Sequence, residues 1–435
     1  MLELAQAGMP VSTLLQHIAE LGQRLPDQRA LPPEQLIEAP FTRDQAQFHA
    51  VTTRAKRKAG GSVGCGARSS CRGGLMFAGR RLRRAPLVGI AAAMFAAACG
   101  NTGTGSPVDV GSGSLTGAGA TFPAPFYTKA FFDYAAKYPQ VTVNYQAIGS
   151  GGGISAFQKG TVDFGASDVP MSAADQAKVP GGAAAMVQVP TTLGVIAVTY
   201  NLSGVSKLQL DGPTLANIYL GHISKWNDPA IAALNSGVTL PSSAIQVVHR
   251  ADSSGTTYHF TDYLAKVSDE WKSKVGVAKA VSWPVGIGSA QNAGVAQSVT
   301  STAGAIGYNE LAYVVQANMS QAYLKNADGN FVQASVAGAT AAASHNTSVS
   351  PTNFSITNEP GATSYPITAF SWVFLYTAYT DPAKGRAVVY LFKWLVTDGQ
   401  SDGTSLQYAA LPTAVQNLAL TSLKTVQAGG KAVLT

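Results

Sequence analysis

The sequence predicts an α/β fold with largely parallel sheets. Strand-like runs rich in β-branched and aromatic residues alternate with runs of helical periodicity from residue 115 onward. Short loops of small polar residues follow several of the strands directly and lead into helices. This order is typical of β–α units, in which helices cover a parallel sheet.

The expected elements follow in chain order. The strand-like runs are 141–148, 162–167, 195–201, 245–250, 305–309 and 370–378. The helical runs are 154–160, 256–267 and 383–396, and the last of these is strongly amphipathic. Residues 326–363 are rich in Ala, Ser, Asn and Thr, so we expect loops there.

Composition indicates a globular chain with few charges. Its 435 residues are 46% hydrophobic and 12% charged, enough for two or three domains. The formal net charge is +7, but residues 1–98 hold 13 of the 30 Lys and Arg and only 6 of the 23 Asp and Glu. The chain from Cys99 onward is balanced, so we expect no nucleic-acid partner. This part has only two arginines, Arg250 and Arg386.

Residues 76–98 have the layout of a secretory signal peptide. A basic start, MFAGRRLRR, precedes an apolar run that is too short for a comfortable transmembrane helix. The ending AAAC (96–99) resembles a bacterial lipobox, which predicts a lipoprotein anchored to the membrane through Cys99; ordinary cleavage after Ala98 is the alternative. We therefore expect an extracytoplasmic protein, in the periplasm or on the outer face of the cytoplasmic membrane.

Residues 1–75 lie upstream of this complete signal. Either translation starts at Met76, or these residues are a disordered extension. Cys65 and Cys71 are a weak metal signal, because no histidine stands at ligand spacing. Residues 99–113 form a flexible Gly/Ser/Thr linker, and after cleavage Cys99 is the only cysteine, which excludes an intramolecular disulfide.

Two strand-to-helix turns are suited to holding an anion. GSGGG (149–153) and SSGT (253–256) each follow a strand and open a helix. The first N–H groups of a helix are unpaired and its dipole favours negative charge there. In open α/β sheets, ligands bind at the carboxyl ends of the strands. Turns of this kind that face one cleft would form an anion site.

Seven segments occur in an order that resembles one family. They are LTGAGATFPAPFY (115–127), VNYQAIGSGGG (143–153), VDFGASDVPMS (162–172), IYLGHISKW (218–226), RADSSGT (250–256), AIGYNELAY (305–313) and YPIT (365–368). Together they resemble the extracytoplasmic phosphate-binding proteins of the bacterial high-affinity phosphate ABC transporter, over about residues 114–435. The resemblance implies a two-lobed periplasmic-binding-protein (Venus-flytrap) fold with a hinge and a ligand cleft between the lobes.

The resemblance also implies where the lobes lie and what they do. Lobe I would comprise 114–192 and 364–435, and lobe II 193–363, with crossings near 190–194 and 363–366. The function implied is high-affinity capture of inorganic phosphate outside the cytoplasmic membrane and its delivery to an ABC permease and its ATPase. We expect a monomer with no catalysis, metal or cofactor.

Carried over position by position, the resemblance implies a set of phosphate-binding residues. They are Thr121, Phe122 (through its backbone N–H), Ser150, Asp168, Arg250, Asp252, Ser254, Gly255 and Thr256. The sequence departs from the family pattern at two positions, with Ser253 where glycine is frequent and Gly151 where serine is frequent. Neither side chain is an expected donor. The side chain of Phe122 would also suit the core.

Three charged residues in this set have distinct expected roles. Arg250 suits two phosphate oxygens because its planar guanidinium is bidentate, the alternative being a surface salt bridge. Asp252 would orient Arg250 and temper its charge, or cap the following helix. Asp168 would repel sulfate or molybdate but accept a hydrogen bond from a protonated phosphate, which favours phosphate. The alternative for Asp168 is a turn cap.

A hydrolase is the alternative from another class of protein. Ser254 stands beside Asp252, and His249 and His259 are close in sequence. However, Ser254 does not stand in a G-x-S-x-G motif, and His249 precedes Arg250 on a strand, so the two side chains point to opposite faces. His259 falls in the first turn of a helix with apolar periodicity, which favours packing. We therefore expect no enzyme activity.

Overall fold

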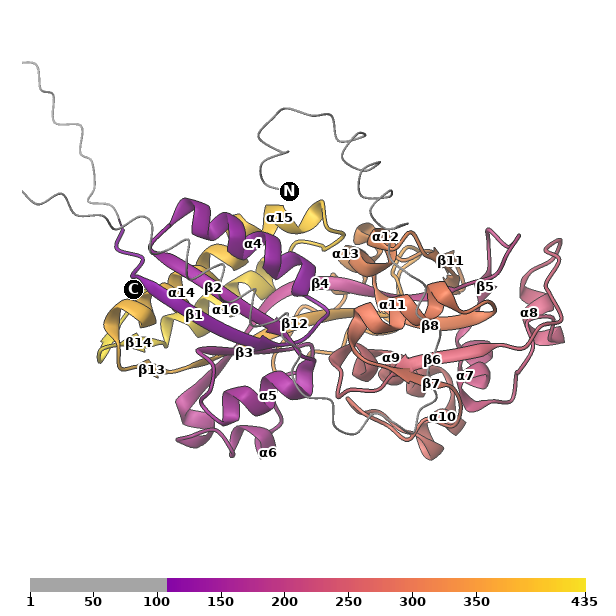
Figure 1. Ribbon diagram of the computed structural model, residues 1–435, viewed down its shortest axis with the longest axis horizontal. Coiled ribbons are helices and arrows are strands. Elements are labelled where there is room, and N and C mark those ends of the chain that lie inside the picture. Colours follow the sequence, from indigo (N-terminus) through magenta and orange to yellow (C-terminus); the bar gives the residue numbers. More distant parts are fainter. Residues whose placement is uncertain (1–107) are drawn as a thin grey trace, which may run out of the picture. The chain divides into compact units, whose positions relative to one another are not determined.

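The computed structural model describes residues 108–435 (Figure 1). The predicted extension 1–75, the signal peptide 76–98, the lipidation site Cys99 and the first part of the linker lie outside the described residues. The last residues of the predicted linker are packed against the body. Val110 is buried, and the Ser112 N–H donates to the carbonyl oxygen of Ala383 at 3.3 Å.

Within residues 108–435, nine strands form one sheet with the order β2-β1-β3-β12-β4-β8-β6-β7, and β9 pairs with β4. These strands are β1 (Gly113–Gly119), β2 (Val141–Ala147), β3 (Phe164–Ser167), β4 (Met186–Tyr200), β6 (Gln246–Arg250), β7 (Ile287–Ser289), β8 (Ala305–Glu310), β9 (Ser320–Gln321) and β12 (Thr368–Tyr376). Two small sheets consist of β5 (Gln209–Leu210), β10 (Tyr323–Lys325) and β11 (Phe331–Val332), and of β13 (Ala378–Tyr379), β14 (Gln427–Ala428) and β15 (Lys431–Ala432).

The large sheet is mixed, so the expectation of largely parallel sheets is wrong at its centre. Strand β1 runs parallel to β2 and β3, and β6 runs parallel to β8 and β7. The central strands β12 and β4 are antiparallel to each other and to their other neighbours, β3 and β8. Both are buried, nearly continuous apolar runs, and such a pattern carries no information about strand direction.

Strand β4 belongs to both ends of the sheet. It pairs with β12 from Met186 to Val195 and with β8 from Ile196 to Tyr200. We call β2, β1, β3, β12 and the start of β4 the first half-sheet, and the end of β4 with β8, β6 and β7 the second half-sheet. Both lie in the same compact unit of the chain. The lobe boundaries implied by the family remain a prediction.

Helices pack around both half-sheets (Figure 1). They are α4 (Ala124–Lys137), α5 (Ser150–Gln158), α6 (Ala173–Gln176), α7 (Gly212–Leu220), α8 (Pro229–Leu234), α9 (Gly255–Val267), α10 (Asp269–Lys274), α11 (Gln291–Ser301), α12 (Leu311–Gln316), α13 (Val336–Ala343), α14 (Pro382–Val396), α15 (Ser401–Thr404) and α16 (Thr413–Lys424). Among the helices of residues 108–435, none is long and apolar enough to cross a membrane.

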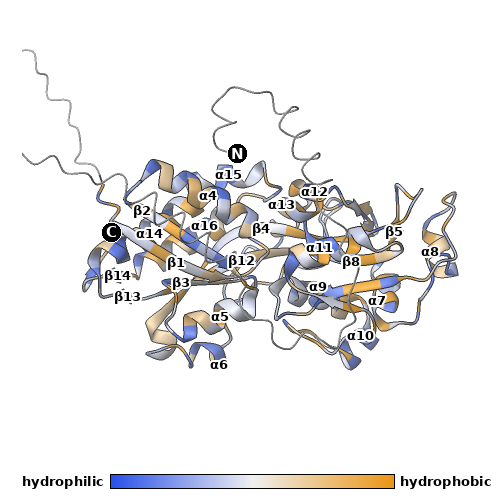
Figure 2. Cartoon of the chain, viewed as in Figure 1, coloured by the Kyte–Doolittle hydropathy of each residue, from blue (hydrophilic) through white to orange (hydrophobic). Residues whose placement is uncertain are grey.

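The core follows the apolar faces that the sequence predicts. Figure 2 shows apolar residues recurring along the strands of the large sheet, and Trp372 and Phe374 of β12 are completely buried. Helix α14 buries Leu391 and Phe392, as its amphipathic pattern predicts. Helix α13 lies in the stretch where loops were expected. It forms because the Ser335 hydroxyl caps an alanine-rich turn.

Candidate anion-binding site

The first group of predicted site residues lies where three neighbouring parallel strands end. Thr121 and Phe122 follow β1, Ser150 opens α5 after β2, and Asp168 follows β3. The carboxyl ends of β2, β1 and β3 meet at one edge of the sheet, which places the turns side by side. The Phe122 ring is completely buried and packs edge-on against Tyr408, so its side chain belongs to the core.

The second group lies at the end of β6. Arg250 is the last residue of that strand, and α9 begins at Gly255. The Ser254 hydroxyl is the cap of α9, because its Oγ accepts from the N–H of Thr257 at 3.2 Å. Thr256, in the first turn, is completely buried. This turn therefore presents a guanidinium, two hydroxyl groups and the start of a helix in one place.

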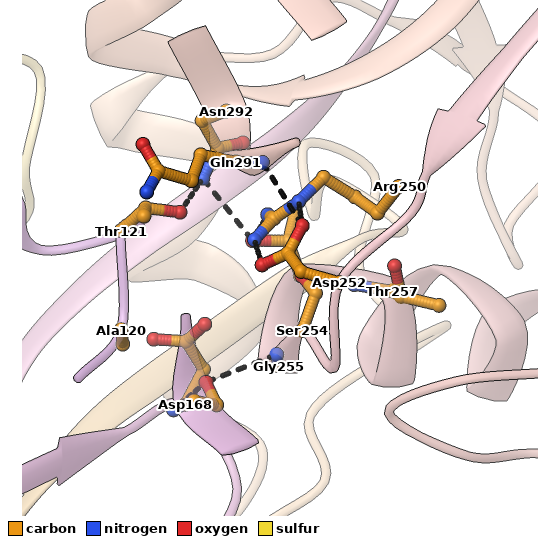
Figure 3. Close-up of polar contacts among 12 residues, drawn as sticks. Ala120, Thr121, Asp168, Arg250, Asp252, Ser254, Gly255, Thr257, Gln291 and Asn292 are labelled. Atoms are coloured by element: carbon orange, nitrogen blue, oxygen red, sulfur yellow. Dashed lines mark hydrogen bonds and ion pairs between the residues drawn. The ribbon is translucent and has the colours of Figure 1, made fainter. Parts of the chain in front are cut away.

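The two groups meet across the half-sheets (Figure 3). The Ser150 Oγ accepts from the N–H of Gly255 at 3.0 Å and from the N–H of Asp168 at 3.3 Å. The Gly151 N–H donates to the Ser253 carbonyl oxygen at 2.9 Å. The structure thus brings the predicted residues of both turns to one location, whereas their role as phosphate ligands remains a prediction.

Glycines allow this close approach. A Cβ atom on Gly255 would lie 2.5 Å from Asp168 Oδ2, which is an overlap. Gly149, with a φ of 85°, caps α5, and a Cβ there would overlap Asp252 Oδ2. The backbone at Gly255 therefore approaches the Asp168 carboxyl group, and the backbone at Gly149 approaches that of Asp252. A larger residue at either glycine would prevent this approach.

Arg250 is buried and paired. Its side chain donates from Nε to Asp252 Oδ1 at 2.8 Å and from Nη2 to Asp252 Oδ2 at 2.5 Å, and the residue is only 3% exposed. Burial opposes ionisation of Asp252, but the hydrogen bonds and charge of Arg250 outweigh it and hold the pKa of Asp252 below its ordinary value. Asp252 thus orients the guanidinium, as predicted, and Ser254 rather than Asp252 caps the helix. A surface salt bridge does not describe Arg250.

Asp168 is a buried carboxyl group at the same site. Burial raises the pKa of Asp168 to about 7, although a hydrogen bond from Ser371 and the charge of Arg250 act in the opposite direction. The turn after β3 is tied by Ser167, whose Oγ accepts from the Val169 N–H at 3.0 Å. The turn-cap interpretation of Asp168 is therefore not needed to explain this turn.

The sequence analysis missed Asn292, which is completely buried at the start of α11. Its Nδ2 lies 2.9 Å from Thr121 Oγ1 and 3.3 Å from Thr256 Oγ1, so it ties the two groups together. Figure 3 shows Asn292 beside Thr121, on the opposite side of the Arg250–Asp252 pair from Asp168. The signal was AQNAG after the strand IGS, a third strand-to-helix turn of small residues.

The two histidines are not arranged as the bases of a hydrolase. His249 stacks on Trp283 with ring centroids 4.6 Å apart. His259 is completely buried, and its Nε2–H donates to the Asp168 carbonyl oxygen at 2.8 Å. Burial lowers the pKa of His259, which keeps the ring neutral. The carbonyl contact of His259 was not foreseen from the sequence, which indicated only packing.

Comparison with known proteins gives a consistent result. Residues 104–398 match the family model of a PBP superfamily domain. The chain is 43% identical over 302 residues to phosphate-binding protein PstS of Xylella fastidiosa, covering 68% of this chain and 81% of the relative. It is 44% identical over 309 residues to phosphate-binding protein PstS of Pasteurella multocida, covering 69% and 87%.

Solved structures share the fold. A high affinity periplasmic phosphate-binding protein, PfluDING, bound with phosphate, superposes with a TM-score of 0.58 at 22% identity, covering 71% of this chain and 94% of that one. A phosphate binding protein from Stenotrophomonas maltophilia gives 0.54 at 19% identity, with the same coverage. These matches confirm the predicted α/β fold of the periplasmic-binding-protein type. The chain belongs to the PBP superfamily and, within it, to the PstS family of phosphate-binding proteins.

Proposed function

We propose that this protein captures inorganic phosphate outside the cytoplasmic membrane and delivers it to an ABC permease and its ATPase for import. One observation carries the proposal: four buried hydroxyl groups at the site accept hydrogen bonds from neighbouring N–H groups. They belong to Thr121, Ser150, Ser254 and Thr256. As acceptors in these bonds the four oxygens keep their own protons, and protons are what an anion requires.

A buried anion needs hydrogen bonds to nearly all of its oxygens, because it loses strong hydration. In the proposal, the four hydroxyls, the Phe122 N–H and the helix starts at Ser150 and Gly255 supply these bonds. Arg250 supplies the charge, with Asp252 holding its orientation. The names of the relatives, which are phosphate-binding proteins, support this choice of anion.

Asp168 would set the selectivity. Above about pH 7, where Asp168 is ionised, its carboxylate lies against the turn of Gly255 and can accept a hydrogen bond only from an anion that carries a proton. HPO4²⁻ and H2PO4⁻ carry one, whereas sulfate does not. With sulfate, an acceptor would face an acceptor in a buried site, which is unfavourable.

Capture would proceed by closure of two lobes, 114–192 with 364–435 and 193–363, about the crossings near 190–194 and 363–366. Each lobe contributes only part of the donor set, so the set would be complete only when the lobes are closed. The protein would act as a monomer without catalysis, anchored through lipidated Cys99. An intact mass of the native protein tests both the lipid and the start at Met76.

Isothermal titration with phosphate, sulfate and arsenate tests the function. We expect phosphate to bind with micromolar affinity or tighter, which corresponds to a binding free energy of about −8 kcal/mol or a more negative value. Arsenate should compete in part, and sulfate should bind far more weakly. Asp168→Asn should narrow the gap between phosphate and sulfate. Equal binding of sulfate and phosphate by the wild type would overturn the selectivity argument. Turnover of a chromogenic phosphoester would instead support a hydrolase.

A further inference from the structure

Glu310 is a buried carboxyl group that the proposed phosphate site does not use. It ends β8, is completely buried, and its Oε2 accepts from the N–H of Ala312 at 2.9 Å at the start of α12. Its Oε1 has no hydrogen-bond partner in the described part of the chain. The ion pairs of residues 108–435 do not include it. An ionised carboxylate in this environment would be unfavourable.

Two routes connect Glu310 to the turn after β1. The Tyr408 hydroxyl lies 2.9 Å from Glu310 Oε2 and 2.7 Å from the carbonyl oxygen of Phe122. The Glu310 N–H donates to Asn292 Oδ1 at 3.3 Å, and the amide of Asn292 holds Thr121. The protonation of Glu310 therefore bears on the position of the Phe122 peptide.

The protons in this chain can be counted. The Tyr408 hydroxyl carries one proton and has two close neighbours, the Phe122 carbonyl and Glu310 Oε2. A carbonyl oxygen can only accept, and an ionised carboxylate can also only accept. If Glu310 were ionised, one of the two contacts would lack a proton. A protonated Glu310 satisfies both, because it donates to Tyr408 and Tyr408 donates to Phe122.

We propose that Glu310 is a neutral carboxylic acid that donates a hydrogen bond to the Tyr408 hydroxyl. The Tyr408 hydroxyl in turn donates to the Phe122 carbonyl oxygen, and this chain of hydrogen bonds positions the Thr121–Phe122 turn for phosphate. This role rests on the proposed function. Ionisation of Glu310 would remove one hydrogen bond from the chain and would add a negative charge close to a bound anion. Glu310 is a positioning residue, and phosphate affinity should depend on its proton.

The titratable neighbours favour the neutral acid. Burial raises the pKa of Glu310 well above its ordinary value, although hydrogen bonds with Ala312 and Tyr408 act in the opposite direction, and the nearby charge of Asp168 raises it further. Tyr313 of α12 and Tyr408 are also close, and burial raises the pKa of both phenols, so neither supplies a charge. The charge of Arg250 acts on Tyr313 and Asp168, where it lowers the pKa of each group. A bound phosphate would raise the pKa of Glu310 again.

Infrared spectroscopy tests the protonation directly and does not depend on phosphate binding. The Asp168→Asn variant is the suitable background, because in it Asp168 cannot contribute a protonated carboxyl band. At about pH 8 this protein should show the carbonyl band of a buried carboxylic acid, and adding Glu310→Gln should remove it. The exposed Glu270, which pairs with Lys274, provides the matched control, and Glu270→Gln should leave the band unchanged. Absence of the band in the Asp168→Asn protein would overturn the proposal.

Calorimetry with phosphate tests the positioning role. Glu310→Gln keeps a donor toward Tyr408 but loses the acceptor toward Ala312, whereas Glu310→Ala loses both. We expect Glu310→Gln to weaken phosphate binding by no more than about fivefold, and Glu310→Ala and Tyr408→Phe to weaken it by about tenfold or more. If Glu310→Gln binds phosphate as weakly as Glu310→Ala does, the positioning role of Glu310 is overturned. A wild type that does not bind phosphate would overturn the proposed function instead, and the infrared result would stand.

Discussion

Ser253 occupies the space that a side chain at Gly151 would need. A Cβ atom on Gly151 would lie 2.5 Å from the Ser253 Cβ, and the Gly151 N–H already donates to the Ser253 carbonyl oxygen at 2.9 Å. These are the two positions at which the sequence departs from the family pattern. The departures are therefore in contact, and the small residue on one side accommodates the larger residue on the other.

This contact predicts that the two positions compensate for each other. Gly151→Ser should weaken phosphate binding by about tenfold, because the added side chain forces the turns of α5 and α9 apart. Ser253→Gly alone should change binding little, and the double variant should recover most of the affinity. A double-mutant cycle by calorimetry measures the coupling. If the double variant binds as weakly as Gly151→Ser, the compensation is wrong.

The two arginines of the body offer a matched pair of variants. Arg250→Lys should weaken phosphate binding by about tenfold or more, because an ammonium cannot replace the bidentate fork toward both Asp252 and an anion. Arg386 is partly exposed and pairs with Asp109 at 3.1 Å, so Arg386→Lys should leave binding unchanged. Titration of both variants with phosphate makes the comparison, and equal losses would exclude a specific role for Arg250.

The buried Asp168 should make the stability of the ligand-free protein depend on pH. Burial raises its pKa to about 7, so the folded protein keeps a proton that the unfolded chain has released above about pH 4. The contribution of this proton to the free energy of unfolding is fully present below the pKa of the carboxyl group in the unfolded chain. It is lost as the pH rises through the folded pKa of about 7. Asp168→Asn cannot lose a proton in this way. The free energy of unfolding of Asp168→Asn minus that of the wild type should therefore increase by on the order of 2 kcal/mol between about pH 5 and pH 8.

Urea denaturation of both ligand-free proteins at several pH values provides this measurement. Burial lowers the pKa of His259, but this histidine is present in both proteins, so its contribution largely cancels in the difference. A difference that does not change with pH would show that Asp168 is ionised throughout this range.

Asn292 should support binding through the two hydroxyls that it holds. Asn292→Ala leaves Thr121 Oγ1 and Thr256 Oγ1 without this donor, so we expect phosphate affinity to fall by about tenfold. Asn235 is a suitable control, because it is also buried but bonds to Gln209 and Ile231, away from the site. Asn235→Ala should lower the thermal midpoint without changing the Kd. Similar affinities for both variants would assign Asn292 to stability alone.

Local features of the site were predictable from the sequence, whereas long-range ones were not. The turns GSGGG and SSGT can be recognised in the sequence because the strand, the small residues and the helix start are adjacent in the chain. Asn292 contacts Thr121 across 171 residues of sequence, and His259 contacts Asp168 across 91. Nothing in the pattern around a single buried polar residue indicates such a partner.

The same limit applies to the fold. The periodicity located β2, β3, β6, β8, β12 and the end of β4, but not β1, β7, β9 or the first part of β4. The family that the seven ordered motifs indicated is confirmed. Direction was not encoded, because β4 and β12 are apolar on both faces and pair antiparallel only after the chain has returned from the second half-sheet. The role of Glu310 also depends on a distant residue, Tyr408, that stands 98 positions away.

Strand β4 changes its pairing partner between Val195 and Ile196. The strand is continuous there, but its ladder with β12 ends and its ladder with β8 begins. The lobe motion proposed above requires one half-sheet to turn relative to the other, and a twist at this point would leave both ladders intact. Separating the turns would break hydrogen bonds between them, such as those from Gly255 to Ser150 and from Gly151 to Ser253. In the proposed lobe motion, opening would therefore break contacts between the turns while the strand ladders of the core stay paired.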